Sequence, residues 1–243
     1  MDLRGRVALV TGAGRRVGQA LAIALGRRGA TVAVHYAASA DGAAETAREI
    51  TGAGGRAETF EADLTAPGAP EALVGRVVAA LGGLHVLINS AAIMERTPFG
   101  EVSTDQWERI FALNLRAPFF LAQAAAPHLR ASGGTMVNIA DLAAYETWPG
   151  YIPHGLSKSG IVHMTRSLAR VLAPDVRVNA IAPGTVLLPD DWRRADEERL
   201  NRTTPLGRQG SPEDVVAAML YLVDAEYVTG ETLIVDGGRH VRA

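Results

Sequence analysis

The stretch VALVTGAGRRVG, residues 7–18, joins a wholly apolar run to a turn that contains three glycines. An apolar residue at every position from Val7 to Val10 is typical of a strand buried on both faces of a parallel sheet. Glycines between a strand and a helix let the backbone turn tightly, so that a pyrophosphate can meet the first N–H groups of the helix. The spacing Gly-x-Gly-x-x-x-Gly is one residue longer than the usual dinucleotide fingerprint. Many glycine-rich turns bind nothing, but the position directly after an N-terminal strand favours a phosphate site.

The rest of the chain repeats this alternation of short β-branched runs and longer segments rich in Ala, Leu and Arg. We expect strands at Val7–Thr11, Thr31–His35, Arg56–Glu61, Val86–Asn89, Thr135–Ile139, Val176–Ile181 and Thr232–Val235. We expect helices at Val17–Arg28, Gly42–Thr51, Pro70–Leu81, Asp105–Leu129, Gly155–Leu172 and around Pro212–Val223. Seven strands separated by helices predict an α/β fold, a single doubly wound parallel sheet of the Rossmann type with helices on both faces. No repeat or break in composition divides the chain, so residues 1–243 are expected to form one domain.

Composition removes several classes of function. The 243 residues hold 24 Lys+Arg against 26 Asp+Glu, which is not the basic balance of a nucleic-acid-binding protein. The absence of cysteine excludes disulfides, thiolate zinc sites and cysteine nucleophiles. No run approaches the roughly 18 apolar residues of a membrane span, and the run after Arg6 is too short for a signal peptide. We therefore expect a soluble cytoplasmic protein with a small-molecule substrate and no metal; His85, His128, His163 and His240 lack metal-ligand spacing.

The end of the second predicted strand bears on the choice of cofactor. NAD sites usually place a carboxylate there to hold the ribose hydroxyls, but this chain has none until Asp41. Arg15 and Arg16 lie in the glycine turn, close to where a 2′-phosphate would sit, and guanidinium groups pair well with phosphate. NADP(H) is therefore favoured over NAD. The alternative is that both arginines only solvate a loop.

Motifs spread over nearly the whole chain resemble those of the short-chain dehydrogenases/reductases. Besides the glycine turn they include Asp63-Leu64, Asn89-Ser90-Ala91-Ala92, Asn114, Lys158, Pro183-Gly184 and Thr229-Gly230…Val235-Asp236-Gly237-Gly238. The resemblance implies a nicotinamide nucleotide bound by Gly12, Gly14, Arg15, Arg16, Val17, Gly18, His35, Tyr36, Ser39, Asp63, Leu64, Asn89, Ser90, Ala91, Lys158, Pro183 and Gly184. It also implies a homotetramer, with the two long helices and the C-terminal strand at the interfaces.

One residue narrows the resemblance. Arg16 stands where the family usually has glycine or another small residue, and Thr-Gly-x-x-x-Arg-x-Gly is similar to the pteridine reductase branch, as is His35-Tyr36 followed by Ser39. That branch reduces dihydropterins and dihydrofolate with NADPH. Its aromatic residue and serine after the fourth strand are replaced here by Ala92-Ile93-Met94. We expect the substrate to contact Arg16, Met94, Asp141, Trp148 and Tyr151.

The catalytic positions depart from the family pattern of Ser, Tyr and Lys assisted by Asn. Lys158 and Asn114 are present, but the tyrosine position is His154 and the serine position is Asp141. Aspartate there fits the pteridine reductases, whereas the histidine fits neither pattern. Lys158 disfavours an imidazolium and Asp141 favours one, so we hypothesise that Asp141 and His154 deliver the proton together. Tyr151, or Tyr145 in the preceding loop, could substitute.

Residues 185–204, with Leu187, Leu188 and Trp192, have no strong periodic pattern and are expected to form a mobile substrate lid. The main expectation is an NADPH-dependent reductase of C=N or C=O bonds, similar to pteridine reductases. One alternative is a general ketone or 3-oxoacyl reductase. The other is a catalytically impaired protein that binds a dinucleotide as a sensor or scaffold.

Overall fold

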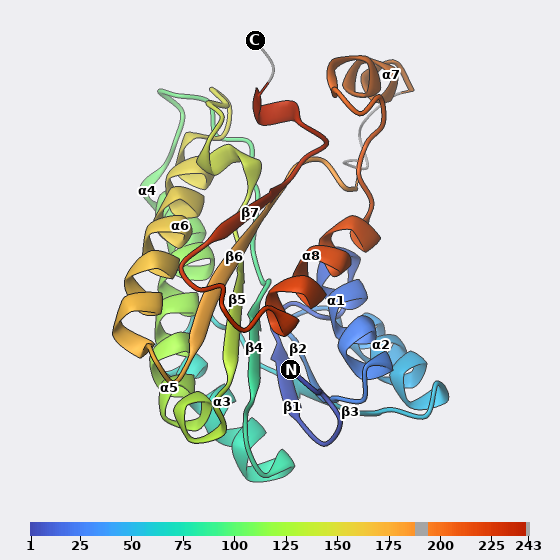
Figure 1. The fold of residues 1–243 in the computed structure, drawn as a ribbon. Helices are drawn as coiled ribbons and strands as arrows, with labels where there is room; N and C mark the ends of the chain where they lie inside the picture. Colours follow the sequence, from blue (N-terminus) through green and yellow to red (C-terminus); the bar gives the residue numbers. More distant parts are fainter. Residues whose placement is uncertain (188–193, 242–243) are drawn as a thin grey trace.

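A computed structural model describes residues 1–187 and 194–241. Seven strands form one parallel sheet (Figure 1): β1 (Val7–Val10), β2 (Thr31–Tyr36), β3 (Arg56–Glu61), β4 (Val86–Asn89), β5 (Thr135–Ile139), β6 (Arg177–Pro183) and β7 (Thr232–Val235). The strand order is β3-β2-β1-β4-β5-β6-β7, and every pairing is parallel. The fold class predicted from the sequence is confirmed, and each strand lies within two residues of its expected bounds.

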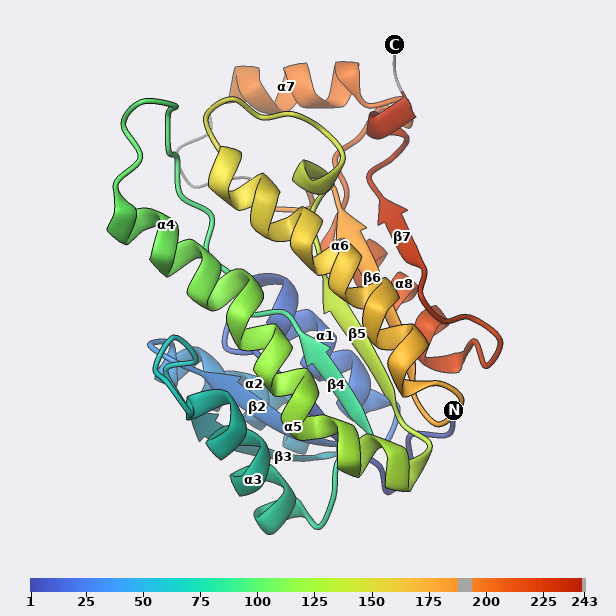
Figure 2. The same ribbon diagram turned by 90° about the vertical axis from the view of Figure 1, so that its left-hand side faces the viewer.

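Helices cover both faces of the sheet (Figures 1 and 2). On one face lie α1 (Arg16–Arg27), α2 (Ala40–Gly52) and α8 (Pro212–Asp224); on the other lie α3 (Ala69–Leu81), α4 (Thr104–Phe111), α5 (Ala117–Ser132) and α6 (Ile152–Leu172). Each face has its own apolar core. Leu21, Ile50 and Met219 belong to the first, and Leu73 and Leu121 to the second. Because both faces are buried, the central strands lack polar alternation, which explains the apolar run at Val7–Val10.

The long helix predicted over Asp105–Leu129 is wrong as a single element. A π-helical segment, Ala112–Arg116, separates α4 from α5. Pro118 has no N–H to give to the carbonyl of Asn114 four residues earlier, so ordinary α-helical bonding cannot continue through this point. The change in winding places Asn114 in the buried interior.

The segment expected to form a mobile lid, residues 185–204, is not an irregular loop throughout, because α7 (Arg194–Thr203) is a helix. Its role as a lid stays a prediction. The sequence of this segment gives little sign of a helix, because Leu200 is buried and apolar while the other described side chains of α7 are polar. Arg194 and Glu198 pair across one turn at 3.0 Å. Figure 2 shows α7 lying across the end of the molecule to which the strands point. Leu188 and Trp192, named with the lid, lie outside the described residues.

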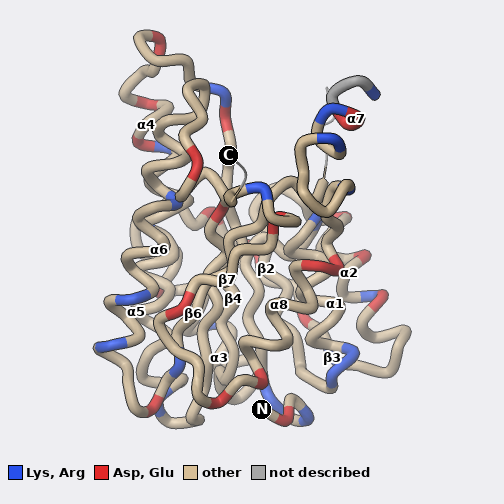
Figure 3. Tube along the Cα trace, turned by 45° about the horizontal axis from the view of Figure 1, so that its top comes forward, with Lys and Arg blue, Asp and Glu red and all other residues tan. Residues whose placement is uncertain are grey.

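The strand order reverses between β1 and β4, and in such sheets ligands bind at the carboxyl ends of the strands at this point. In the view of Figure 3 acidic and basic residues are interspersed along the chain. None of the helices in the described ranges has the length and apolar character needed to cross a bilayer. Those same ranges contain no cluster of three His, Cys, Asp or Glu arranged to hold a metal ion.

Candidate active site

The glycine turn after β1 leads directly into the N-terminus of α1. Gly12 has φ +67°, and a Cβ there would lie 2.9 Å from the Cα atom of Ala91, so only glycine fits. No side chain caps α1, and its first turn contains no acidic residue. The first N–H groups of a helix lack partners within the helix and carry its positive dipole end. This donor set, with Arg15 and Arg16 exposed beside it, suits the pyrophosphate of a dinucleotide.

The side chain of His35 bonds the main chain of the glycine turn. The Nδ1 atom accepts a hydrogen bond from the Gly12 N–H (3.1 Å), and Nε2 donates to the carbonyl of Ala62 (3.0 Å). Burial lowers the pKa of this imidazole from 6.5 to about 4, although the Ala62 bond acts in the other direction. A neutral ring is required, because only a neutral ring can accept at one nitrogen and donate at the other. The sequence predicted a cofactor contact for His35; its ring nitrogens instead bond the protein's own main chain.

Arg16 is the one non-glycine residue with positive φ among the described residues, at +53°. This left-handed conformation costs an L-residue with a Cβ roughly 1–2 kcal/mol. The Arg16 Nη2 atom donates to the carbonyl of Leu187 (3.4 Å), which links the glycine turn to the start of the expected lid.

The remaining expected nucleotide contacts surround this turn. Tyr36 ends β2 and Ser39 follows it, both half-buried, and Asp63 is exposed after β3. Hydrogen bonds from the side chain and the N–H of Thr65 lower the pKa of Asp63. The Leu64 side chain is buried in the core, so only its main chain is available to a ligand. Val17 and Gly18 lie in α1, while Pro183 is the last residue of β6 and Gly184 follows it.

Thr11, which the sequence reading missed, connects the turn to the segment after β4. Its Oγ1 atom accepts hydrogen bonds from the N–H groups of Ser90 (2.9 Å) and Ala91 (3.0 Å). Asn89 is buried and donates from Nδ2 to Asn138 Oδ1 (2.8 Å). The sequence did contain a signal for Thr11, because it is a polar residue directly after the apolar run Val7–Val10.

The same segment also contacts the catalytic positions. Asn114 bonds the main chain of Ile93 twice, accepting at Oδ1 from its N–H and donating from Nδ2 to its carbonyl, each at 2.9 Å. Asn114 Nδ2 also donates to Ser157 Oγ (3.2 Å), a second contact that the sequence reading missed. The π-helical segment therefore fixes the loop that passes between the glycine turn and α6.

Lys158 is the only lysine in the sequence, and its side chain is buried. The Nζ atom donates to the carbonyl of Ile139 at the end of β5 (2.8 Å). Burial lowers the pKa of Lys158 from 10.5 to about 8, while the nearby Asp141 carboxylate acts in the opposite direction. A buried amine at the carboxyl end of a central strand is suited to binding hydroxyl groups of a ligand.

Asp141 and His154 face each other beside this lysine. His154 Nε2 lies 3.6 Å from Asp141 Oδ2, and His154 Nδ1 lies 3.2 Å from the carbonyl oxygen of Ile93. Nδ1 also lies 3.4 Å from Asn114 Nδ2, which can only donate. The Ile93 contact requires hydrogen on Nδ1 and the Asn114 contact requires a lone pair there, so the two contacts fit different tautomers of the neutral ring. Both hold the ring with Nε2 facing the Asp141 carboxyl group.

Trp148, Tyr151 and Met94 lie on loops around this pair. Trp148 and Tyr151 are half-buried and meet edge to face, with ring centroids 6.3 Å apart. Tyr151 precedes the first residue of α6, and Met94 is 49% exposed. Tyr145 is also exposed. We call Trp148 and Tyr151, which the sequence predicts to contact the substrate, the substrate wall.

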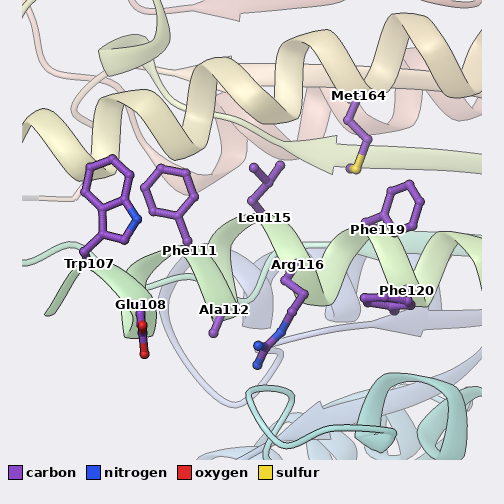
Figure 4. A pocket seen from close by; sticks show the side chains of 9 residues that line it. All are labelled: Trp107, Glu108, Phe111, Ala112, Leu115, Arg116, Phe119, Phe120 and Met164. Carbon is purple, nitrogen blue, oxygen red and sulfur yellow. The ribbon is translucent and has the colours of Figure 1, made fainter. Parts of the chain in front are cut away.

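A separate apolar groove of about 700 Å³ lies on the outer side of α4, α5 and α6. In Figure 4 Trp107, Phe111 and Leu115 point towards α6, from which Met164 points back. Trp107 and Phe111 are stacked with centroids 4.4 Å apart. None of the expected catalytic, cofactor or substrate residues lines this groove.

Comparisons with known proteins match nearly the whole chain. A family model described as enoyl-(acyl carrier protein) reductase matches residues 12–240. The 3beta-hydroxysteroid dehydrogenase 1 of Eggerthella lenta is 36% identical over 98% of this chain and 94% of its own. The angucycline C-6 ketoreductase LanV with bound NADP matches with a TM-score of 0.93 and 32% identity, over 99% of this chain and 98% of its own.

A 7α-hydroxysteroid dehydrogenase complexed with NADH and 7-oxo glycochenodeoxycholic acid gives a TM-score of 0.93 at 32% identity, over 98% of this chain and 95% of its own. These relatives act on ketones or alcohols by name, and the two structures hold different nicotinamide nucleotides. The expectation of a pteridine substrate gains no support from them.

Proposed function

The chain belongs to the short-chain dehydrogenase/reductase family, and on that premise we propose that it is an NADPH-dependent reductase of ketones. The observation that carries the proposal is the Asp141–His154 pair, which can hold a proton beside the buried amine of Lys158. The nicotinamide, when bound, supplies the hydride. The N–H groups at the start of α1 would hold the pyrophosphate, Arg15 and Arg16 the 2′-phosphate, and Lys158 the ribose hydroxyls.

The protein's own part in the reaction is to supply a proton to the substrate oxygen. Asp141 Oδ1 accepts from the Ala143 N–H (2.7 Å), which fixes the carboxyl group while Oδ2 faces His154. The Asp141 side chain is 25% exposed and that of His154 is 3% exposed, so the carboxyl group is the outer member of the pair. The proton therefore reaches the substrate through Asp141 while His154 holds and replenishes it from behind.

A second candidate is a nucleotide-binding protein with impaired turnover. Imidazole is shorter than the phenol of tyrosine, and His154 is almost fully buried, so the ring does not extend as far toward a substrate. If Asp141 does not relay the proton, the chain would bind nucleotide without reducing ketones efficiently.

Both candidates are separated by one set of measurements on the purified protein. NADPH oxidation is followed with a 3-oxosteroid, an aryl ketone, a 3-oxoacyl thioester, dihydrobiopterin and dihydrofolate, and nucleotide binding is measured by calorimetry. Turnover of a ketone supports the proposal, whereas turnover of the pterins alone replaces it. Nucleotide binding without any turnover supports the second candidate, and no binding of NADPH or NADH overturns both.

We also propose that a second copy of the chain covers the groove between α4, α5 and α6, as part of a homotetramer. Phe119 and Leu156 are 44% and 49% exposed on these helices, and a groove lined by Trp107 and Phe111 is a costly surface to leave in water. The variant Phe119→Glu is expected to reduce the mass measured by light scattering. An unchanged mass, or a monomeric wild type, contradicts this assembly.

A further inference from the structure

We propose that Arg239 is a positioning residue that fixes the substrate wall from the C-terminal end of the chain. This role concerns the substrate site of the proposed reductase and therefore rests on the proposed function. Arg239 comes 85 residues after His154 in sequence, yet its guanidinium packs on the loop that leads into α6.

The contacts of Arg239 reach two loops at once. Its Nη2 atom lies 3.5 Å from Glu146 Oε2, and its Nη1 atom donates to Thr185 Oγ1 (3.2 Å). The guanidinium carbon lies 5.7 Å from the centre of the Trp148 ring, within the range of a cation–π contact. Trp148 Nε1 donates to the same Glu146 oxygen (2.9 Å), so Glu146 receives both the indole and the guanidinium.

This cluster is well shielded from solvent. The Arg239 and Glu146 side chains are 16% and 19% exposed, which distinguishes their pair from the open ion pairs elsewhere, such as Arg27–Glu49. A shielded charge pair is screened less by water and salt than an exposed one. Arg239 Nε is buried without a hydrogen-bond partner in the described part of the chain, so the arrangement is not optimised for stability alone.

The backbone that carries Arg239 is itself held in place. The Asp236 side chain is 2% exposed, and it accepts from the N–H groups of Gly238 (2.9 Å) and His240 (2.6 Å) and from His240 Nδ1 (2.8 Å). These bonds fix the short helical turn Arg239–Val241 at the end of β7. The backbone of Arg239 is therefore held in place by hydrogen bonds on either side of it.

The loop that Arg239 grips is continuous with the catalytic helix. Trp148 contacts Tyr151, whose carbonyl accepts from the Gly155 N–H in the first turn of α6 (2.9 Å). The Thr97 N–H donates to the carbonyl of Gly150 (2.7 Å), so the segment after Met94 is tied to the same loop. Fixing Trp148 thus fixes the wall that a substrate would meet in front of Asp141. A lysine could not replace Arg239, because the flat guanidinium stacks on the indole while its two terminal nitrogens reach separate acceptors.

The test first asks whether Arg239 holds Trp148, without reference to activity. Trp148 is made the sole tryptophan by Trp107→Phe and Trp192→Phe, and Arg239→Met is compared with Arg239→Lys and with the exposed control Arg27→Met. We expect the acrylamide quenching constant of Trp148 to rise about twofold in both Arg239 variants, because the ring loses the guanidinium over its face. Unchanged quenching overturns the proposal.

The second readout is kinetic and uses the best ketone of the panel above. Arg239→Met is expected to raise KM about tenfold with kcat nearly unchanged, as for a loss of uniform substrate binding, and to leave NADPH affinity unaltered. A fall in kcat at constant KM overturns the positioning role. If Arg239→Met does not fold, Glu146→Gln replaces it, because this variant keeps an acceptor for the indole N–H but removes the charge pair. Glu146→Gln must then also raise KM while leaving kcat nearly unchanged. Absence of turnover with every ketone overturns the proposed function, and the quenching result then decides the contact separately.

Discussion

His154 and Asp141 face each other through Nε2 and Oδ2, 3.6 Å apart, with the carboxyl group on the solvent side of the imidazole. Since His154 Nδ1 contacts the carbonyl of Ile93 and Nδ2 of Asn114, the ring is held with Nε2 turned towards Asp141. A histidine at this position thus acquires a defined orientation and a partner.

The two members of this pair should act as a unit. Asp141→Asn and His154→Ala are each expected to lower kcat about 10²- to 10³-fold, since each removes the proton donor. The double variant should be no slower than the slower single one by more than about threefold, because coupled residues are not additive. The exposed control Asp175→Asn should keep full activity. Multiplicative losses in kcat, or wild-type pH profiles in both single variants, would show that the residues act separately.

Tyr151 is expected to shape the site and not to supply the proton. Tyr151→Phe removes only the hydroxyl and should keep kcat within about threefold of the wild type, as is usual for a residue outside the proton transfer. A loss near that of His154→Ala would assign the proton to Tyr151. Tyr145→Phe serves as the matched control.

Arg16 should lower the stability of the fold and strengthen the binding of NADPH. Arg16→Gly removes the left-handed strain and is expected to raise the free energy of unfolding by about 1 kcal/mol, whereas Arg16→Ala should not. Both variants should weaken NADPH binding about tenfold, because one charge-assisted phosphate contact is lost, and should leave NADH binding unchanged. Urea unfolding and calorimetry measure the two effects. Equal losses for NADPH and NADH would contradict the 2′-phosphate contact.

His35 should make the fold sensitive to acid. Its pKa is about 4 in the folded chain and 6.5 when unfolded, with the charge of Arg76 also opposing protonation. The unfolded state binds the proton more readily between these values, so this contribution is complete above pH 6.5 and is lost as the pH falls towards 4. Between neutral pH and pH 4.5 the loss is about 2 kcal/mol. His35→Gln should flatten this dependence, while the exposed control His163→Gln should not.

Lys158 should lose its charge near pH 8. Below that pH the ammonium has three donors, one of which bonds the carbonyl of Ile139 and two of which are left for ligand hydroxyls. Above that pH one donor and the charge are lost, so kcat/KM is expected to fall. Because Lys158 is the only lysine, trace acetylation followed by mass spectrometry reports its titration directly. A midpoint close to 10.5, the ordinary value for lysine, would contradict the effect of burial.

Most of the sheet could be predicted from the sequence because its buried strands are local apolar runs, although β3 is largely polar and exposed. β3, β4, β5 and β7 match the expected bounds in full. Interactions between distant residues carried no such signal. Pro118 gave no clear signal of the break, because Pro127 lies inside α5 without ending it. α7 has little apolar pattern besides Leu200, and nothing local indicates that Arg239 meets Glu146. The resemblance to the family indicated which positions to expect as catalytic, and these stay predictions, but the direction in which His154 points required the structure.

The π-helical segment at Ala112–Arg116 also has a consequence for how tolerant this chain is of length changes. Because Pro118 cannot donate to the carbonyl of Asn114, deleting one residue there would not let α4 and α5 merge into one regular helix. Each residue of a helix turns the chain by about 100°, so a deletion that the wide winding does not absorb would rotate α4 relative to α5 by about that angle. Such a shortened chain would keep its sheet but carry Trp107 away from α6, separating the outer aromatic surface from the amide that orders the catalytic loop.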